Sequence, residues 1–175
     1  GERDSYLAAL STYAERLYLI GARDPLHEVA DEIAGMLESL LETPPANTDE
    51  RITRLDAAVV VWHDALFRGN PERAKGFLDR LLAFLPPPAE QSDRELRGAA
   101  EAIRLMADYS FRRGEFAEAL DLASPYINEM DRMRPETLNA LLKVLLPAML
   151  DAGRLDEGKE MVEVGLRLRR EADLF

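Results

Sequence analysis

Apolar residues recur at steps of three and four along most of the chain, the spacing that gathers them on one face of an α-helix. Between residues 4 and 20, the expected buried face consists of Leu7, Leu10, Ala14, Leu17 and Tyr18. The cleanest stripe of the first half follows, with Leu26, Val29, Ile33, Met36, Leu37, Leu40 and Leu41. The pattern predicts an all-α chain of about eight helices, in antiparallel pairs near residues 4–42, 49–85, 93–130 and 135–171.

Glycine and proline divide these segments. Gly69, Gly114 and Gly153 each follow an apolar stripe, so we expect each of them to end a helix. The triple proline at 86–88 is the sharpest boundary in the chain. Pro125 lies inside a helical pattern and should kink or split that helix, because proline lacks the backbone donor.

Polar residues indicate where two helices begin. Ser92 is followed three residues later by Glu95, which is the spacing of a capping box. Thr48 or Asp49 is expected to cap the helix of the second pair. That helix contains a β-branched run at 59–61, which leaves a short strand as the alternative.

The sequence around the three turn glycines resembles the tetratricopeptide repeat, a helical hairpin with small and aromatic residues at fixed places. Near Gly114 the matching residues are Met106, Ala107, Phe116, Ala119 and Ala123. Near Gly69 they are Ala74, Leu78, Leu81 and Pro86, and near Gly153 they are Leu145, Leu155 and Val162, with Gly158 in place of alanine. The glycines are 45 residues (69 to 114) and 39 residues (114 to 153) apart, so the repeats are irregular and longer than the usual period of about 34.

The resemblance implies a single domain, residues 1–175, in which the helix pairs stack as a right-handed α-solenoid. It also implies a concave face, built from the first helix of each pair, that binds a peptide or a protein. The groove residues it selects are His63, Phe67, Arg104, Asp108, Phe111, Arg112 and Lys143. Three of these residues are cations, and together they could recognise a carboxylate-bearing segment: Arg104, Arg112 and Lys143. The alternative is that these cations are solvated and paired with Glu101, Asp108 and Asp151.

The amino-acid composition limits the kinds of molecule that the chain is expected to bind. The net charge of −11 disfavours direct binding to nucleic acid or to an anionic membrane surface. No apolar run is long enough to span a membrane, and cysteine is absent, which excludes disulfides and thiolate chemistry. Only three of the 22 basic residues are lysine, a bias typical of a GC-rich bacterial genome. The compartment stays open, with the cytoplasm favoured.

Catalytic chemistry finds little support in the sequence. His27 and His63 are the two histidines, and neither belongs to a metal-ligand spacing. His63 stands beside Asp64, but neighbouring residues on a helix point in different directions. Phosphate-binding glycine loops are missing as well. We therefore expect no enzymatic activity, no cofactor and no metal.

Two functions remain. The first is a non-catalytic interaction or scaffolding module that binds a peptide, a partner protein or a second copy of itself. The second is a regulatory or sensory helical region of a larger bacterial signalling or transcription protein. The second interpretation rests on a first residue that is Gly1 rather than Met and on the end of the chain at Phe175.

Overall fold

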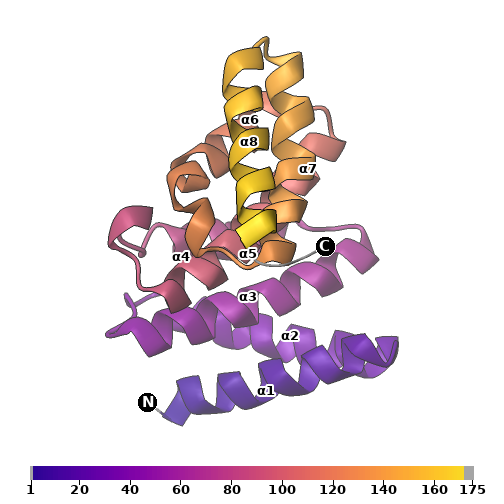
Figure 1. The fold of residues 1–175 in the computed structure, drawn as a ribbon. Coiled ribbons are helices and arrows are strands. Elements are labelled where there is room, and N and C mark those ends of the chain that lie inside the picture. The colour runs from indigo at the N-terminus through magenta and orange to yellow at the C-terminus, as the bar shows by residue number, and fades with distance from the viewer. Residues whose placement is uncertain (1, 172–175) are drawn as a thin grey trace. The chain divides into compact units, whose positions relative to one another are not determined.

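The computed structural model describes residues 2–171, and every regular element in that range is helical (Figure 1). The first half contains α1 (Glu2–Leu19), α2 (Arg23–Leu40), α3 (Thr48–Arg68) and α4 (Glu72–Leu82). The second half contains η1 (Pro88–Glu90), α5 (Asp93–Arg112), α6 (Phe116–Ala123), η2 (Ser124–Arg132), α7 (Pro135–Asp151) and α8 (Leu155–Glu171), where η denotes a 3₁₀ helix. The prediction of an all-α chain with eight α-helices is confirmed for this range.

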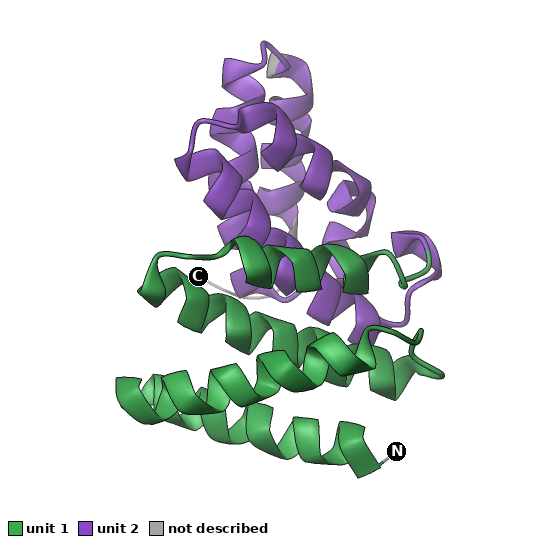
Figure 2. Cartoon of the chain, turned by 180° about the vertical axis from the view of Figure 1, so that it is seen from behind, with its two compact units in different colours: residues 1–86 green, residues 87–175 purple. Residues whose placement is uncertain are grey.

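The helices form two compact units, Gly1–Pro86 and Pro87–Phe175, called unit 1 and unit 2 below (Figure 2). Their boundary falls in the triple proline. In unit 1, α1, α2 and α3 all contact one another, and α4 packs on α3. In unit 2, α5, α6 and α7 all contact one another, and α8 packs on α7. Each unit thus contains two helix pairs whose first helices touch.

The first helix of each pair is followed by the same turn. A glycine with positive φ stands at each turn: Gly21 (70°), Gly69 (72°), Gly114 (78°) and Gly153 (73°). At Gly114, the glycine N–H donates to Phe111 O and the next N–H donates to Ser110 O, both at 2.9 Å. This is the Schellman pattern, and the other three turns repeat it. The three predicted helix ends are confirmed, and Gly21 adds a fourth.

A buried arginine ties the helices of unit 1 together. The Arg54 side chain is 4% exposed. From α3 its guanidinium donates to Asp4 Oδ1 of α1 at 3.0 Å. It also donates to Leu40 O at 2.9 Å and to Thr43 O at 3.0 Å, carbonyls at and beyond the end of α2. Arg54 therefore satisfies backbone acceptors that α2 leaves open at its C-terminus.

One predicted helix cap is present in the structure, and another lies at a different residue. Ser92 and Glu95 form the predicted capping box at α5. The cap of α3 is Asn47, whose Oδ1 accepts from the Glu50 N–H at 2.9 Å, so the assignment to Thr48 or Asp49 was wrong. Helix α3 runs unbroken through 59–61, which rules out the strand alternative.

Pro125 acts as predicted. Helix α6 ends at Ala123, and the chain continues as the nine-residue 3₁₀ segment η2. Pro147, by contrast, lies inside α7 without interrupting it.

Candidate interaction surface

The structure brings two of the predicted groove residues together in unit 1. The His63 ring stacks on the Tyr18 ring, with centroids 5.1 Å apart and planes 19° apart. The Phe67 ring lies against the same tyrosine at 5.8 Å. The Arg23 guanidinium lies 5.5 Å from the centroid of the Phe67 ring, within cation–π range. We call Tyr18, Arg23, His63 and Phe67 the Tyr18 face.

The three rings of this face lie on the first helices of both pairs of unit 1, and Arg23 begins α2. Tyr18 is near the end of α1, and His63 and Phe67 are near the end of α3. Near the other ends of these helices, Asp4 pairs with Arg54. The two helices therefore run parallel and side by side, so their residues combine into one surface.

The Tyr18 face is open to solvent. Tyr18 is 42% exposed and Phe67 is 51% exposed. The next two residues are also exposed apolar residues: Leu19, the last residue of α1, is 80% exposed, and Ile20, just after the helix, is 76% exposed. Our expectation that Tyr18 belongs to the buried face of the first helix was wrong. The ring lies at the edge of the buried stripe, where it covers His63 and Phe67 and keeps one side in water.

An ion-pair network holds α2 against α3 next to this face. The Asp64 side chain is buried and accepts from Arg68 Nε at 2.7 Å. Its other oxygen contacts His27 Nδ1 of α2. Arg68 also donates to His27 O at 2.7 Å and pairs with Asp31 of α2 at 3.1 Å. Asp64 therefore pairs with His27, and the neighbouring His63 stacks on Tyr18 instead.

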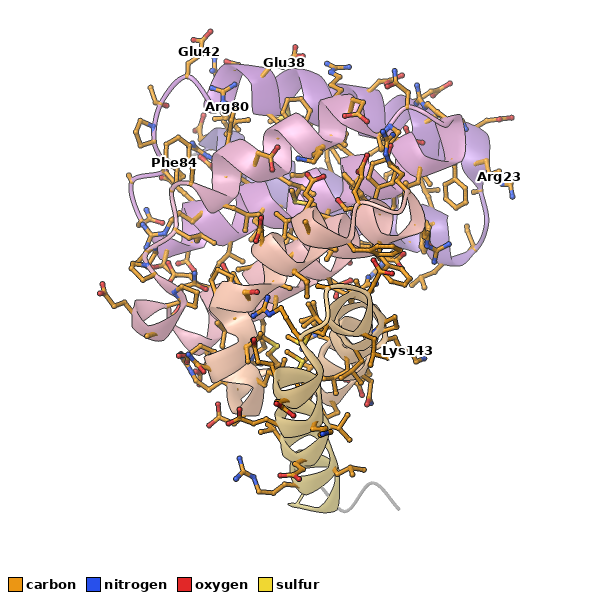
Figure 3. All side chains as sticks on the ribbon, turned by 90° about the horizontal axis from the view of Figure 1, so that it is seen from above. Arg23, Glu38, Glu42, Arg80, Phe84 and Lys143 are labelled. Carbon is orange, nitrogen blue, oxygen red and sulfur yellow. The ribbon has the colours of Figure 1, made fainter. Side chains whose placement is uncertain are left out.

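The predicted cations lie in unit 2, and two of them are paired within their own helix. Arg104 donates to Glu101 at 3.0 Å through Nε, and Arg112 pairs with Asp108 at 2.8 Å. These are the local pairs expected of solvated charges. Lys143 is exposed on α7 (Figure 3). The predicted joint recognition of a carboxylate by the three cations stays a prediction.

Phe111, also predicted for the groove, lies against the core of unit 2. Its ring is 5.3 Å from that of Phe116 on α6, at a tilt of 57°. It also packs against a buried cluster of Ala107, Ala119 and Val144 from three different helices. Packing therefore accounts for Phe111 within its own unit.

The sequence did not identify Tyr18 or Arg23 as residues of the surface, nor the pair of His27 with Asp64 that supports it. The only available signal for the pair was a charged residue, Asp64, inside an apolar stretch of α3. Its partner is 37 residues away, so no local spacing identifies it.

Metal-binding groups, membrane-spanning helices and similarity to known proteins point to no further function of the described residues. Among the residues that the structure describes, no group of three or more His, Asp or Glu side chains is placed to hold a metal ion. Likewise, none of the described helices is long and apolar enough to cross a membrane. No protein-family model, curated protein or solved structure matches the chain.

Proposed function

We propose that this chain is a non-catalytic interaction module of the tetratricopeptide-like kind, which holds a segment of a partner protein on the Tyr18 face. The observation that carries the proposal is the concentration of exposed aromatic side chains on α1 and α3. These rings come from the first helices of two successive pairs, the helices that form the binding surface in the repeat family that the sequence resembles.

The local architecture supports this proposal. Every helix pair has the same glycine turn, and in both units the first helices of the two pairs contact each other. In helical-repeat proteins a helix pair has too little core to be stable alone, so stacking of neighbouring pairs buries their shared faces and leaves the first helices on an outer surface. Side chains on that surface are free to bind other molecules.

The chemistry of the face indicates the kind of segment that would bind. Tyrosine and phenylalanine offer large apolar area with few rotatable bonds, and aromatic residues are enriched at protein interfaces. Arg23 lies at the edge, where it can donate paired hydrogen bonds to a carboxylate. The expected segment presents an apolar or aromatic side chain to the rings and an acidic group to Arg23.

Affinity capture from an extract of the native cells tests this proposal. The bait proteins are the wild-type chain, the double variant Tyr18→Ser with Phe67→Ser, and the control Tyr13→Ser. Tyr13 is also on α1 and is 51% exposed, but five residues of helix rotate it about 140° away from Tyr18.

A protein retained by the wild type and by Tyr13→Ser, but lost from the double variant, supports the proposal. Equal retention by all three baits would show that the Tyr18 face is not the binding surface. Circular dichroism of each bait checks that the variants remain folded.

A further inference from the structure

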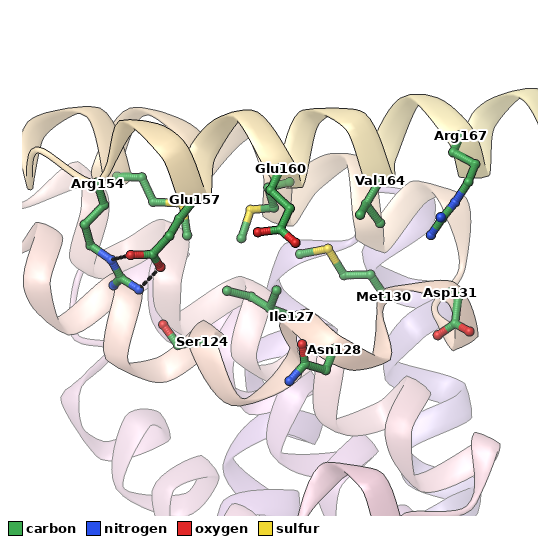
Figure 4. A pocket seen from close by; sticks show the side chains of 12 residues that line it. Ser124, Ile127, Asn128, Met130, Asp131, Arg154, Glu157, Glu160, Val164 and Arg167 are labelled. Atoms are coloured by element: carbon green, nitrogen blue, oxygen red, sulfur yellow. Dashed lines mark hydrogen bonds and ion pairs between the residues drawn. The ribbon is translucent and has the colours of Figure 1, made fainter.

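Unit 2 contains a cavity of about 530 Å³ between η2 and α8, in the size range of ligand-binding clefts (Figure 4). Its lining residues on α8 run from Arg154, just before the helix, to Arg167. Thirteen residues of α-helix span about 20 Å, so the cavity is a groove rather than a round hole.

One wall of the groove is η2, the 3₁₀ segment that contains Pro125. A 3₁₀ helix as long as η2 is uncommon, because its hydrogen-bond geometry is poorer than that of an α-helix. One side of η2 is fixed: Tyr126 is buried and accepts from Gln91 at 3.2 Å, and Arg132 pairs with Asp93 of α5 at 2.9 Å. The other side faces the groove.

That free side carries Ser124, Ile127, Asn128 and Asp131, which recur at three- and four-residue steps. They face a matching row on α8, so two rows of side chains line the groove (Figure 4).

The floor of the groove is apolar and adaptable. Met130, Met149 and Met161 are each at most 3% exposed and come from η2, α7 and α8. Val164 and Ile127 continue this floor. Unbranched methionine side chains can shift to fit different apolar groups, and for this reason they are common on surfaces that accept several peptides.

The charges of the groove favour a cationic partner. At one end Arg154 is already neutralised by Glu157, to which it donates through Nε at 2.9 Å, and this bond lowers the pKa of Glu157. Near the middle, the Glu160 carboxylate points from α8 toward the groove (Figure 4). Within the described part of the chain, no basic side chain pairs with Glu160. Asp131 and Arg167 lie at the far end.

We propose that this groove binds a short segment of a partner protein in which a lysine or arginine is flanked by apolar side chains. The apolar side chains contact the methionine floor, and the basic group pairs with Glu160. The elongated form of the groove favours a peptide over a compact small molecule. The site is in unit 2 and is separate in its residues from the Tyr18 face, so either site can fail without the other.

Selection of short random peptides displayed on phage, panned against the full chain, tests the proposal. Enriched peptides are labelled with fluorescein, and their affinities are measured by fluorescence anisotropy. The variants are Glu160→Gln, Glu160→Arg and Asn128→Trp, the last of which places a bulky ring in the groove. The control is Glu163→Arg, an exposed glutamate of α8 outside the groove lining.

We expect the enriched peptides to combine a basic residue with apolar neighbours. Their affinity should fall about threefold in Glu160→Gln and about tenfold in Glu160→Arg, where attraction becomes repulsion, and stay unchanged in Glu163→Arg. Asn128→Trp should abolish binding while the thermal unfolding midpoint stays near that of the wild type.

Three results would overturn the proposal. The first is that no such peptides are enriched. The second is that the enriched peptides bind Glu160→Arg and Glu163→Arg equally well. The third is that a simple amphiphilic cation such as dodecylamine binds the groove with the same dependence on Glu160 while the peptides do not, which would assign the site to a small molecule.

Discussion

Replacing Arg54 with methionine removes the charge and its hydrogen bonds while keeping much of the side-chain volume. The variant leaves Leu40 O, Thr43 O and the Asp4 carboxylate without their shared donor. Removing one partner from a buried ion pair costs about 3–5 kcal/mol, because the other partner stays desolvated. Since whole domains are stable by about 5–15 kcal/mol, this is a large fraction of the stability of unit 1.

The chain provides its own probe for this experiment. Trp62 is the single tryptophan, is fully buried and belongs to unit 1, so its fluorescence reports the unfolding of that unit. Circular dichroism follows the helices of both units. With a urea slope of about 2 kcal/mol per molar, the expected loss lowers the fluorescence midpoint by about 2 M.

Arg73→Met is the matched control. Arg73 also joins two helices of unit 1, through Glu38 at 2.7 Å, but both side chains are more than half exposed. Exposed pairs contribute at most about 1 kcal/mol. If Arg54→Met shifts the tryptophan midpoint no more than Arg73→Met does, the interpretation of Arg54 as a buried clamp is refuted.

Three further predictions, with four variants, concern local structure and are tested by thermal or urea unfolding. Gly114→Ala should lower the free energy of unfolding by about 1 kcal/mol, because φ is 78° at this residue. Gly76→Ala, inside α4 with open space around its Cβ, should raise the free energy of unfolding by about 0.5–1 kcal/mol. The reverse order of the two variants would contradict the assigned turn. Ser110→Ala should stabilise unit 2 by about 1 kcal/mol, because among the described residues no group forms a hydrogen bond with this buried hydroxyl. A loss of stability in the variant would show that the hydroxyl has a hydrogen-bond partner. Burial raises the pKa of Tyr126, so its contribution to stability should be complete below about pH 10 and should be lost as the pH rises through the folded-state pKa. Tyr126→Phe should weaken this alkaline loss of stability. An alkaline transition that is the same in the variant would refute this cause.

Features that depend on a few neighbouring residues could be predicted from sequence. Gly114 ends its helix because the turn needs a positive φ, and Ser92 caps α5 through a residue three positions away. Pro125 splits its helix because of its own missing donor. In each case the physical cause is local, so the pattern of residues was sufficient.

Features that depend on distant partners could not be predicted in this way. Asp4 and Arg54 are 50 residues apart, and a periodic stripe does not show which charged residue it will bury. Tyr18 fits the apolar stripe of α1, yet it lies at the edge of the buried face, and only the position of α3 decides its exposure. The groove beside η2 likewise depends on how α8 packs, which no spacing along the chain specifies.

The most direct test of the proposed function is site-specific photo-crosslinking in the native cells. Benzoylphenylalanine is placed at Phe67, on the Tyr18 face, and in a separate variant at Tyr13, which is equally exposed elsewhere on unit 1. Binding on the Tyr18 face predicts a discrete cross-linked partner from position 67 that is absent from position 13 and is lost when Tyr18 is also changed to serine. Cross-links from position 13 alone, or identical products from both positions, would contradict it.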